Sequence, residues 1–375
     1  MIKTADSLTE PALLVHRRTN LLTYLALATI ILFNVAGSVY WIQRNIVTLG
    51  HDTAGHLERT LDIAHLLAHP TWQTLFQVIT FHDLRPPIMY IFAQPFYWIF
   101  GYDAHSATLA NVALLALILW LTFDFGRRWS NPTVGLLAAL LTGLFPMLAA
   151  MSRLFYLDNI VAALVMLNLL ALLRCENFTR RGWSLVWGVS LGLGMLAKWP
   201  YPIHILLPSL FVLWQADFFG QQWLALRKFQ VDWRKLALAL LLAAVVVALW
   251  YLPNRIYIHQ EKMILGDALA PIWLLLLTPL LYALLRPVSQ LTNGWTGGLL
   301  AVMIASLWYA PRIDFMNYLA DAAFGSYGGN YQAADPLRLY NYLRYWDYLR
   351  INHLGLLGTV LLVPLGLWPW VARIR

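Results

Sequence analysis

Two carboxylates and two imidazoles lie within eight residues near the N-terminus, in the stretch His51-Asp52-Thr53-Ala54-Gly55-His56-Leu57-Glu58. These are the side chains that most often act as general acids and bases. The stretch follows a hydrophobic segment, residues 21–42, that is long enough to cross a bilayer. Acid and base groups in water beside a membrane could act on the polar end of a substrate whose tail stays in the lipid.

Asp52 is the candidate catalytic residue of this stretch, as a general base or as a carboxylate that orients the substrate. Aspartate is also a favoured helix N-cap, so Asp52 could begin an amphipathic helix as well as, or instead of, serving in catalysis. His56 and Glu58 follow on the same stretch and are candidates for binding or orienting a substrate.

Three cationic side chains at the ends of apolar segments could bind an anionic head group: Arg85, Arg153 and Lys198. A guanidinium can bind phosphate through two parallel hydrogen bonds, and an ammonium can neutralise it. Asp158 follows Arg153 closely and could orient the head group or a metal. Each also has a structural interpretation. Arg85 could anchor a helix at the interface, Arg153 and Asp158 could pair, and Lys198 could snorkel to the water.

Histidines cluster in the same region, but their spacing matches no sharp zinc motif. Histidines in interfacial loops are often simply solvated. The sequence therefore identifies no certain cofactor and leaves a divalent metal as an open alternative. The clustered residues are His51, His56, His65, His69 and His82.

The composition indicates an all-α polytopic membrane protein. Hydrophobic residues make up 60% and charged residues 12% of the 375 residues, whereas soluble domains carry about 25% charged residues. The chain has room for about 10–11 transmembrane helices of the usual length. The net charge of +8 fits basic cytoplasmic loops better than a nucleic-acid partner. A single cysteine, Cys175, excludes an internal disulfide.

The apolar segments predict the spans and the topology. The predicted spans are residues 21–42, 106–125, 133–152, 159–174, 183–197, 203–215, 236–251, 270–285, 298–310 and 354–371. Residues 52–80 predict an amphipathic surface helix that restarts at Pro70-Thr71-Trp72. Residues 86–101 are short for a span. Placing the basic clusters around residues 127, 180 and 228 in the cytoplasm requires that this segment does not cross fully.

This topology divides the chain into three parts. Residues 1–20 form a cytoplasmic tail, and residues 21–215 form the catalytic module with an external loop at 51–85. Residues 216–375 add further membrane helices with a second external loop at 311–350. The candidate residues, together with the turn at Asn254-Arg255, then fall on the extracytoplasmic side of a cell membrane, inner or plasma. Charges near membrane depth are rare and usually functional.

Two similar stretches end apolar runs, Trp250-Tyr251-Leu252-Pro253 and Trp308-Tyr309-Ala310-Pro311. Both are predicted to be helix ends at the outer interface, with their rings in an aromatic belt and a proline stop. The sequence contains no P-loop, dinucleotide fingerprint or serine-hydrolase elbow, which argues against an ATP-driven machine.

Four motifs in order resemble the membrane glycosyltransferases of the GT-C class. The likeness is to the dolichyl-phosphate-mannose protein mannosyltransferase and aminoarabinose transferase group, glycosyltransferase family 39 and its relatives, over about residues 20–210. The motifs that carry the likeness are Asp52-Thr53, Arg85-Pro86-Pro87-Ile88 with Tyr90 and Phe100-Gly101, Ser152-Arg153 with Asp158, and Gly192-Leu193-Gly194-Met195-Leu196-Ala197-Lys198-Trp199. The family has Asp-Glu where this chain has Asp52-Thr53, so a role of that glutamate is absent or falls to Glu58. Many members also continue beyond the point where this chain stops, which makes it a short member or a fragment.

The resemblance implies a sugar donor on polyprenyl phosphate, with Asp52 as the base that activates the acceptor. It implies inversion at the sugar, with Arg85, Arg153 and Lys198 stabilising the phosphate leaving group. The partners would be the lipid-linked sugar, membrane lipid and an acceptor that could be a protein, a glycan or a lipid.

Two other functions stay open. One is a transporter or lipid flippase, although transporters usually place polar sites at the bilayer midplane. The other is a noncatalytic assembly subunit, which Thr53 would favour.

Overall fold

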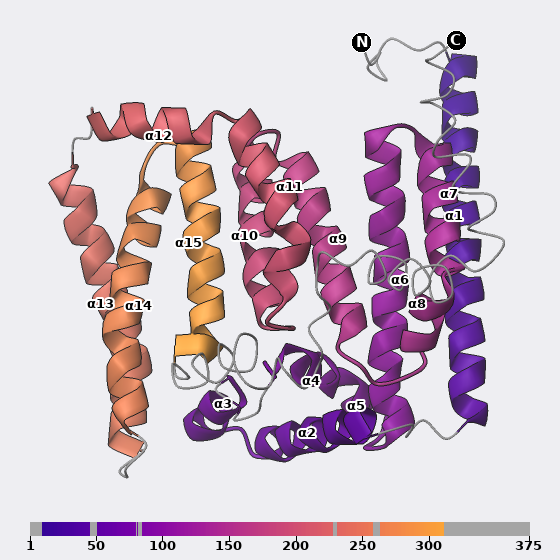
Figure 1. Ribbon diagram of the computed structural model, residues 1–375, viewed down its shortest axis with the longest axis horizontal. Coiled ribbons are helices and arrows are strands. Elements are labelled where there is room, and N and C mark those ends of the chain that lie inside the picture. The colour runs from indigo at the N-terminus through magenta and orange to yellow at the C-terminus, as the bar shows by residue number, and fades with distance from the viewer. Residues whose placement is uncertain are drawn as a thin grey trace, which may run out of the picture. The chain divides into compact units, whose positions relative to one another are not determined.

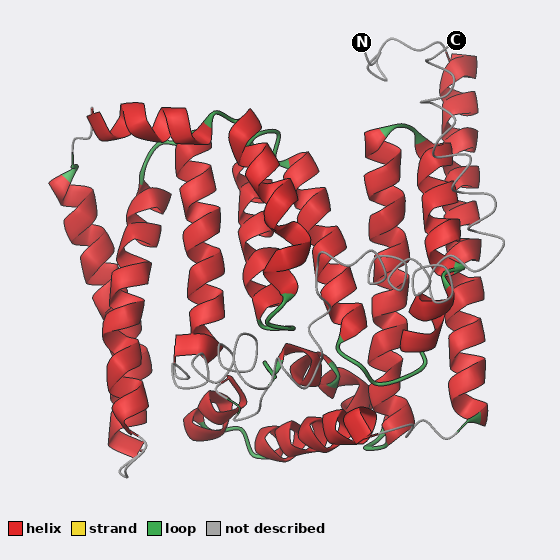
Figure 2. Cartoon of the chain, in the orientation of Figure 1, coloured by secondary structure: helices red, strands yellow, loops and turns green. Residues whose placement is uncertain are grey.

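The computed structural model describes residues 10–45, 51–79, 81, 85–227, 231–257 and 263–310. Every regular element in these ranges is a helix (Figure 2), as the composition predicted. The chain divides into two compact units, each considered by itself. The first unit comprises Met1–Leu49, Thr108–Asn159 and Ala334–Arg375, and the second comprises Gly50–Ala107 and Ile160–Ala333. The predicted span 354–371, the loop 311–350 and His82 lie outside the described residues.

The first unit contains the two longest apolar helices. These are α1 (Glu10–Arg44), of which Asn20–Arg44 is apolar, and α6 (Ala104–Trp129), which begins in the second unit. Both are long and apolar enough to cross a membrane, and four shorter apolar helices occur elsewhere in the described residues. The fold class, an all-α membrane protein with several apolar helices, is confirmed, and the number of crossings stays a prediction.

The predicted span at residues 133–152 is wrong as a single helix. It is divided into α7 (Pro132–Gly143) and α8 (Pro146–Met151). Pro146 has no N–H to continue the hydrogen-bond ladder, so it ends one helix and begins the next. At the start of α7, the side chain of Asn131 accepts a 3.0 Å hydrogen bond from the backbone N–H of Val134. This is the usual way to satisfy a free N–H group at a helix start.

The second unit holds the remaining helices. In chain order they are α2 (His51–Ala68), α3 (Trp72–Ile79), α4 (Ile88–Phe92), α5 (Gln94–Phe100), α9 (Asp158–Arg174, which begins in the first unit), α10 (Arg181–Met195), α11 (Tyr201–Gln215), α12 (Phe218–Arg227), α13 (Trp233–Tyr257), α14 (Met263–Leu285) and α15 (Gln290–Tyr309). Helix α12 was not predicted from the sequence. It lies across the upper end of α15 in Figure 1, and α2 and α3 lie at the opposite, lower end of this unit.

The amphipathic prediction for the first loop is confirmed. The chain forms α2, breaks at Pro70, and resumes as α3 at Trp72. Leu57 and Ala64 of α2 are buried, whereas Glu58 is exposed, so the helix has an inner and an outer face. Helices α4 and α5 together run for 13 residues. At 1.5 Å per residue that is about 20 Å, shorter than the roughly 30 Å bilayer core. Their length therefore agrees with the prediction that this segment does not cross fully.

Helices α10 and α15 pack closely because glycines face each other. A Cβ atom added to Gly297 would lie 2.6 Å from the carbonyl oxygen of Ser184 and 2.8 Å from the ring of Trp187. A Cβ on Gly188 would collide with the backbone of Gly297. Small residues that let helix backbones approach are typical of membrane interfaces. Helix α15 also starts earlier than predicted, because Ser289 and Thr292 form a capping box before it.

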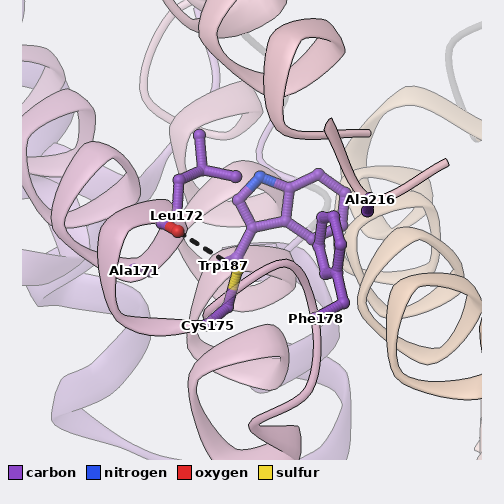
Figure 3. Packing of buried hydrophobic residues seen from close by; sticks show 6 residues of the cluster. All are labelled: Ala171, Leu172, Cys175, Phe178, Trp187 and Ala216. Carbon is purple, nitrogen blue, oxygen red and sulfur yellow. Dashed lines mark hydrogen bonds between the residues drawn. The ribbon is translucent and has the colours of Figure 1, made fainter. Parts of the chain in front are cut away.

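A buried cluster surrounds the turn between α9 and α10 (Figure 3). It consists of Ala171, Leu172, Cys175, Phe178, Trp187 and Ala216. The rings of Phe178 and Trp187 meet edge to face with centroids 5.2 Å apart. Phe178 has φ 64°, in the left-handed region, which costs about 1–2 kcal/mol. Its carbonyl accepts a 2.7 Å hydrogen bond from the amide of Asn293, which helps hold this turn against α15.

Candidate active site

Asp52 and Arg85 meet in the second unit. Asp52 lies in the first turn of α2, and Arg85 comes just before the two prolines that lead into α4. The carboxylate Oδ1 of Asp52 lies 3.4 Å from Nη2 of Arg85. The side chains are 55% and 37% exposed, respectively, so the pair is accessible from solvent. In such a pair, the carboxylate could act as a proton acceptor and the guanidinium could bind a phosphate.

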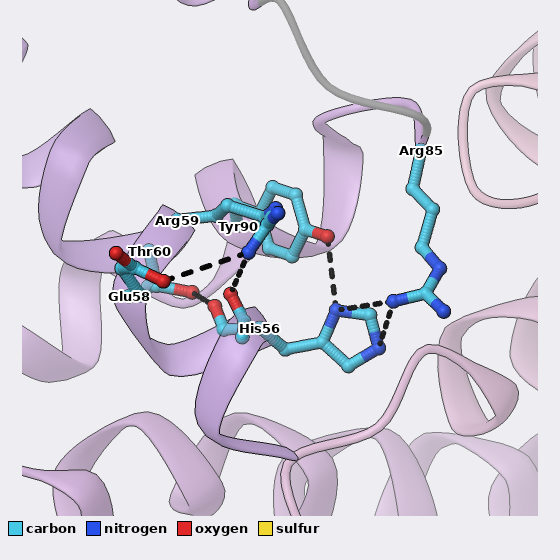
Figure 4. A network of polar contacts seen from close by, with 7 residues as sticks. His56, Glu58, Arg59, Thr60, Arg85 and Tyr90 are labelled. Atoms are coloured by element: carbon cyan, nitrogen blue, oxygen red, sulfur yellow. Dashed lines mark hydrogen bonds and ion pairs between the residues drawn. The ribbon is translucent and has the colours of Figure 1, made fainter. Parts of the chain in front are cut away.

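His56 lies between Arg85 and Tyr90 and is almost fully buried (Figure 4). Nε2 of the imidazole is 3.1 Å from Nη1 of Arg85, and Nδ1 is 2.9 Å from Oη of Tyr90. Nη1 of Arg85 also lies 3.5 Å from Nδ1, so the guanidinium faces both ring nitrogens. The hydroxyl of Tyr90 can donate to Nδ1 or accept from it, according to the tautomer of His56. This arrangement makes His56 a support for Arg85, whereas the sequence suggested substrate binding.

A second layer of hydrogen bonds holds this support in place. Thr60 Oγ1 donates to the carbonyl of His56 at 2.8 Å. The amide of Gln94 donates to the carbonyls of Thr60 at 3.0 Å and Tyr90 at 2.8 Å, which joins α2 to α4 and α5. The family motif includes Tyr90 without giving it a role, and the sequence does not single out Thr60 or Gln94. The only sequence signal for Gln94 is its position four residues after Tyr90, on the same face of a helix.

Replacing Tyr90 with phenylalanine is expected to lower the free energy of unfolding by about 1–3 kcal/mol, because Nδ1 of buried His56 loses its 2.9 Å hydrogen bond to the Tyr90 hydroxyl. Tyr97→Phe is the matched control. Tyr97 is equally buried on the adjacent helix α5. Thermal unfolding of the purified proteins in detergent would compare them. Equal losses for the two variants would contradict a role for the His56–Tyr90 bond.

Glu58 and Thr53 differ in burial. Glu58 is exposed and lies 3.8 Å from Arg59, on the side of α2 away from the ring of His56 (Figure 4). Thr53 is fully buried, in the position where the family motif has glutamate. An ionised side chain there would have to leave water at considerable cost, so threonine suits the position in this chain.

Lys198 lies in the turn that follows α10 and is half-buried. Its backbone N–H donates to the carbonyl of Gly194 at 3.2 Å. The turn needs glycine at 194, because a Cβ atom there would collide with the ring of Tyr201. The N–H of Ile88 approaches the carbonyl of Leu196 at 3.4 Å, which joins the start of α4 to this turn. The segments that carry Arg85 and Lys198 are therefore neighbours.

Arg153 and Asp158 belong to the first unit, in a turn held by Asn111 and by Asn159, whose amide donates to Oγ of Ser152 at 2.9 Å. The amide of Asn111 donates to the carbonyls of Leu154 at 2.7 Å and Tyr156 at 3.0 Å. The guanidinium of Arg153 lies 5.8 Å from the ring centroid of Trp41, and Asp158 is exposed at the start of α9. Their membership in the site stays a prediction.

Two predicted helix ends differ from expectation. Helix α13 runs through Pro253, Asn254 and Arg255 to Tyr257, so no turn forms there. Proline removes one hydrogen bond, and a membrane helix can continue past it when neighbouring groups satisfy the freed carbonyl. Trp308 is fully buried and its indole donates to the carbonyl of Phe81 at 3.1 Å. The expectation that its ring lies in an aromatic belt is wrong.

The described residues contain no group of three or more His, Cys, Asp or Glu side chains that could hold a metal ion. His56 is engaged with Arg85 and Tyr90, and His65 and His69 are exposed. The side chain of His51 is not among those described. A divalent metal therefore stays an open prediction.

The chain is similar to a protein family over part of its length and to a solved structure. A search of curated proteins found no match. Among solved structures, the chain matches "Crystal Structure of ArnT from Cupriavidus metallidurans in the apo state" with 19% identity and a TM-score of 0.37. That match covers 82% of this chain and 64% of the ArnT chain.

The family model described as dolichyl-phosphate-mannose-protein mannosyltransferase matches residues 84–251, a little under half of this chain. Arg85, Arg153, Asp158 and Lys198 lie inside the matched range, and Asp52 lies before it. Residues 84–251 therefore resemble the dolichyl-phosphate-mannose-protein mannosyltransferase family, as the motifs predicted.

Proposed function

We propose that the protein is an integral-membrane glycosyltransferase of the GT-C type. It moves a sugar from a polyprenyl-phosphate donor to an extracytoplasmic acceptor, with inversion at the anomeric carbon. The observation that carries the proposal is the pairing of Asp52 with Arg85 at 3.4 Å, with Arg85 supported from behind by buried His56. The similarity of residues 84–251 to a mannosyltransferase family supports the same reaction class.

In this reaction one side chain of the pair acts on the acceptor and the other on the leaving phosphate. Asp52 accepts the proton of the acceptor hydroxyl as its oxygen attacks the anomeric carbon. The bond between that carbon and the phosphate oxygen breaks on the opposite face, so the sugar inverts. The lipid phosphate leaves with one more negative charge, which Arg85 stabilises through fixed N–H donors. Lys198 completes the phosphate site in this proposal, and the roles of Arg153 and Asp158 rest on the sequence motifs alone.

The charge distribution of the second unit supports an extracytoplasmic site. Helix α12 contacts the start of α15, where Gln221 donates to Gln290 at 3.0 Å. The guanidinium of Arg181 donates to the carbonyl of Leu284 at this end, and Lys235 lies near the start of α13. The opposite end carries Asp52 and Arg85. Basic residues gather on the cytoplasmic side of membrane proteins, which favours the outer side for the pair.

Replacing Arg85 with alanine is expected to lower sugar transfer by about 10²–10³-fold, because the leaving phosphate loses a fixed cation. The assay uses membranes that contain the wild type or a variant and a panel of radiolabelled polyprenyl-phosphate sugars. Arg59→Ala is the matched control, since Arg59 lies on α2 and binds the carbonyl of Gly55 at 2.7 Å. It should transfer sugar within a few-fold of the wild type.

Two outcomes would contradict the proposal in different ways. If the wild type transfers no sugar from any donor of the panel, a transporter, a flippase or a noncatalytic subunit becomes the better explanation. If Arg85→Ala transfers as well as Arg59→Ala, the enzyme stands but Arg85 does not hold the phosphate.

A further inference from the structure

Trp308 and Tyr309, the last two residues of α15, each bind a backbone carbonyl of a different segment in the second unit. The indole Nε1 of Trp308 donates to Phe81 at 3.1 Å, and the hydroxyl of Tyr309 donates to Met195 at 3.0 Å. Their rings meet edge to face with centroids 4.9 Å apart. Trp308 is 0% exposed, so its bond is shielded from competing water. The end of α15 therefore ties together two segments that are distant in the sequence.

Each of these carbonyls lies shortly before a candidate phosphate ligand. Phe81 precedes Arg85 by four residues, and Met195 precedes Lys198 by three. The ring of Phe81 also contacts that of Tyr90, which supports His56 behind Arg85; their centroids are 6.4 Å apart. The two segments are joined further along by the approach of Ile88 N–H to Leu196 at 3.4 Å.

The register of α15 against α10 is itself constrained. A Cβ atom on Gly192 of α10 would lie 2.9 Å from the carbonyl oxygen of Ala301 and 2.7 Å from Cβ of Ile304. With Gly188 and Gly297, this close approach leaves little freedom for α15 to slide. The position of α15 along α10 is therefore fixed. This places Trp308 and Tyr309 beside the segments that carry Arg85 and Lys198.

We propose that Trp308 and Tyr309 are positioning residues that set the spacing of Arg85 and Lys198 for the donor phosphate. The inference rests on the proposed function. Two cations on separate segments bind one phosphate well only when their separation is held before binding, because ordering them afterwards costs binding energy. Both residues lie beyond the range that matches the family model, so the later part of the chain contributes to the site.

The test is the binding of unsugared polyprenyl phosphate to the full-length protein purified in detergent. Trp308→Phe and Tyr309→Phe each remove one hydrogen-bond donor and should weaken binding about tenfold. The matched controls make the same changes at the other end of the unit. Trp295 donates to Gln222 at 2.8 Å, and the hydroxyl of Tyr282 accepts from the backbone of Asp232 at 3.1 Å. Trp295→Phe and Tyr282→Phe should bind within twofold of the wild type. Tyr309→Phe loses only a hydroxyl, so it keeps the test valid if Trp308→Phe unfolds.

Double-mutant cycles separate positioning from general destabilisation. Trp308→Phe should add little to the loss caused by Arg85→Ala, and Tyr309→Phe should add little to that of Lys198→Ala, because a cation that has been removed can no longer be misplaced. Additive losses throughout, or wild-type binding by both α15 variants, would overturn the inference while leaving the enzyme intact. A wild type that neither binds polyprenyl phosphate nor transfers sugar would overturn the proposed function, and the inference with it.

Discussion

Replacing Asp52 with asparagine is expected to lower sugar transfer by about 10²–10⁴-fold, because an amide cannot take the proton of the acceptor hydroxyl. The change keeps the shape of the side chain. Its ion pair with Arg85 is solvent-exposed, and exposed pairs contribute at most about 1 kcal/mol to stability. The variant should therefore fold and reach the membrane as the wild type does. Transfer from a radiolabelled polyprenyl-phosphate sugar, normalised to the amount of protein, is the measurement.

Glu58→Gln is the matched control for Asp52→Asn. Glu58 is a second exposed carboxylate on α2, six residues further on, and it approaches Arg59 at 3.8 Å. The same chemical change there should leave transfer within a few-fold of the wild type. Equal activity in the two variants would remove Asp52 as the base. A large loss with Glu58→Gln alone would instead show that Glu58 takes the role of the acid that Thr53 replaces in the family motif.

Replacing Gly297 with alanine is expected to destabilise the protein by about 1–3 kcal/mol or more, because a new methyl group would be forced into a packed helix interface. The added Cβ would lie 2.6 Å from the carbonyl oxygen of Ser184, closer than such atoms can approach without a backbone shift. Helices α10 and α15 would have to separate, and the position of Trp308 at the end of α15 would change with them. Thermal unfolding in detergent would measure the loss.

The neighbouring residue provides the control. A Cβ atom on Gly298 meets nothing within 4 Å, although Gly298 lies on the same helix. Gly298→Ala should leave stability unchanged or raise it by up to about 1 kcal/mol, because alanine is the better helix former. Similar losses at both positions would show that the α10–α15 contact does not depend on a glycine at 297.

The amphipathic first loop illustrates what local sequence can predict. The spacing of apolar residues and the break at Pro70 predicted α2 and α3 correctly, because both signals act within one helix. The same reasoning was wrong at residues 133–152, where the apolar run suggested one span. Hydropathy measures only composition, and Pro146 divides the run through backbone geometry that hydropathy ignores.

Composition and local pattern determined the all-α membrane class, the surface helix after the first span, and the choice of Asp52 and Arg85 as candidates. The tertiary structure decided how these side chains are supported. His56 meets Tyr90 across 34 residues of chain, and Trp308 reaches Phe81 across 227. Such contacts depend on how helices pack, which no local spacing encodes. The burial of Trp308 was mispredicted for this reason. The local sequence around an aromatic residue at a helix end is the same whether its ring faces lipid or packs against another segment of the chain.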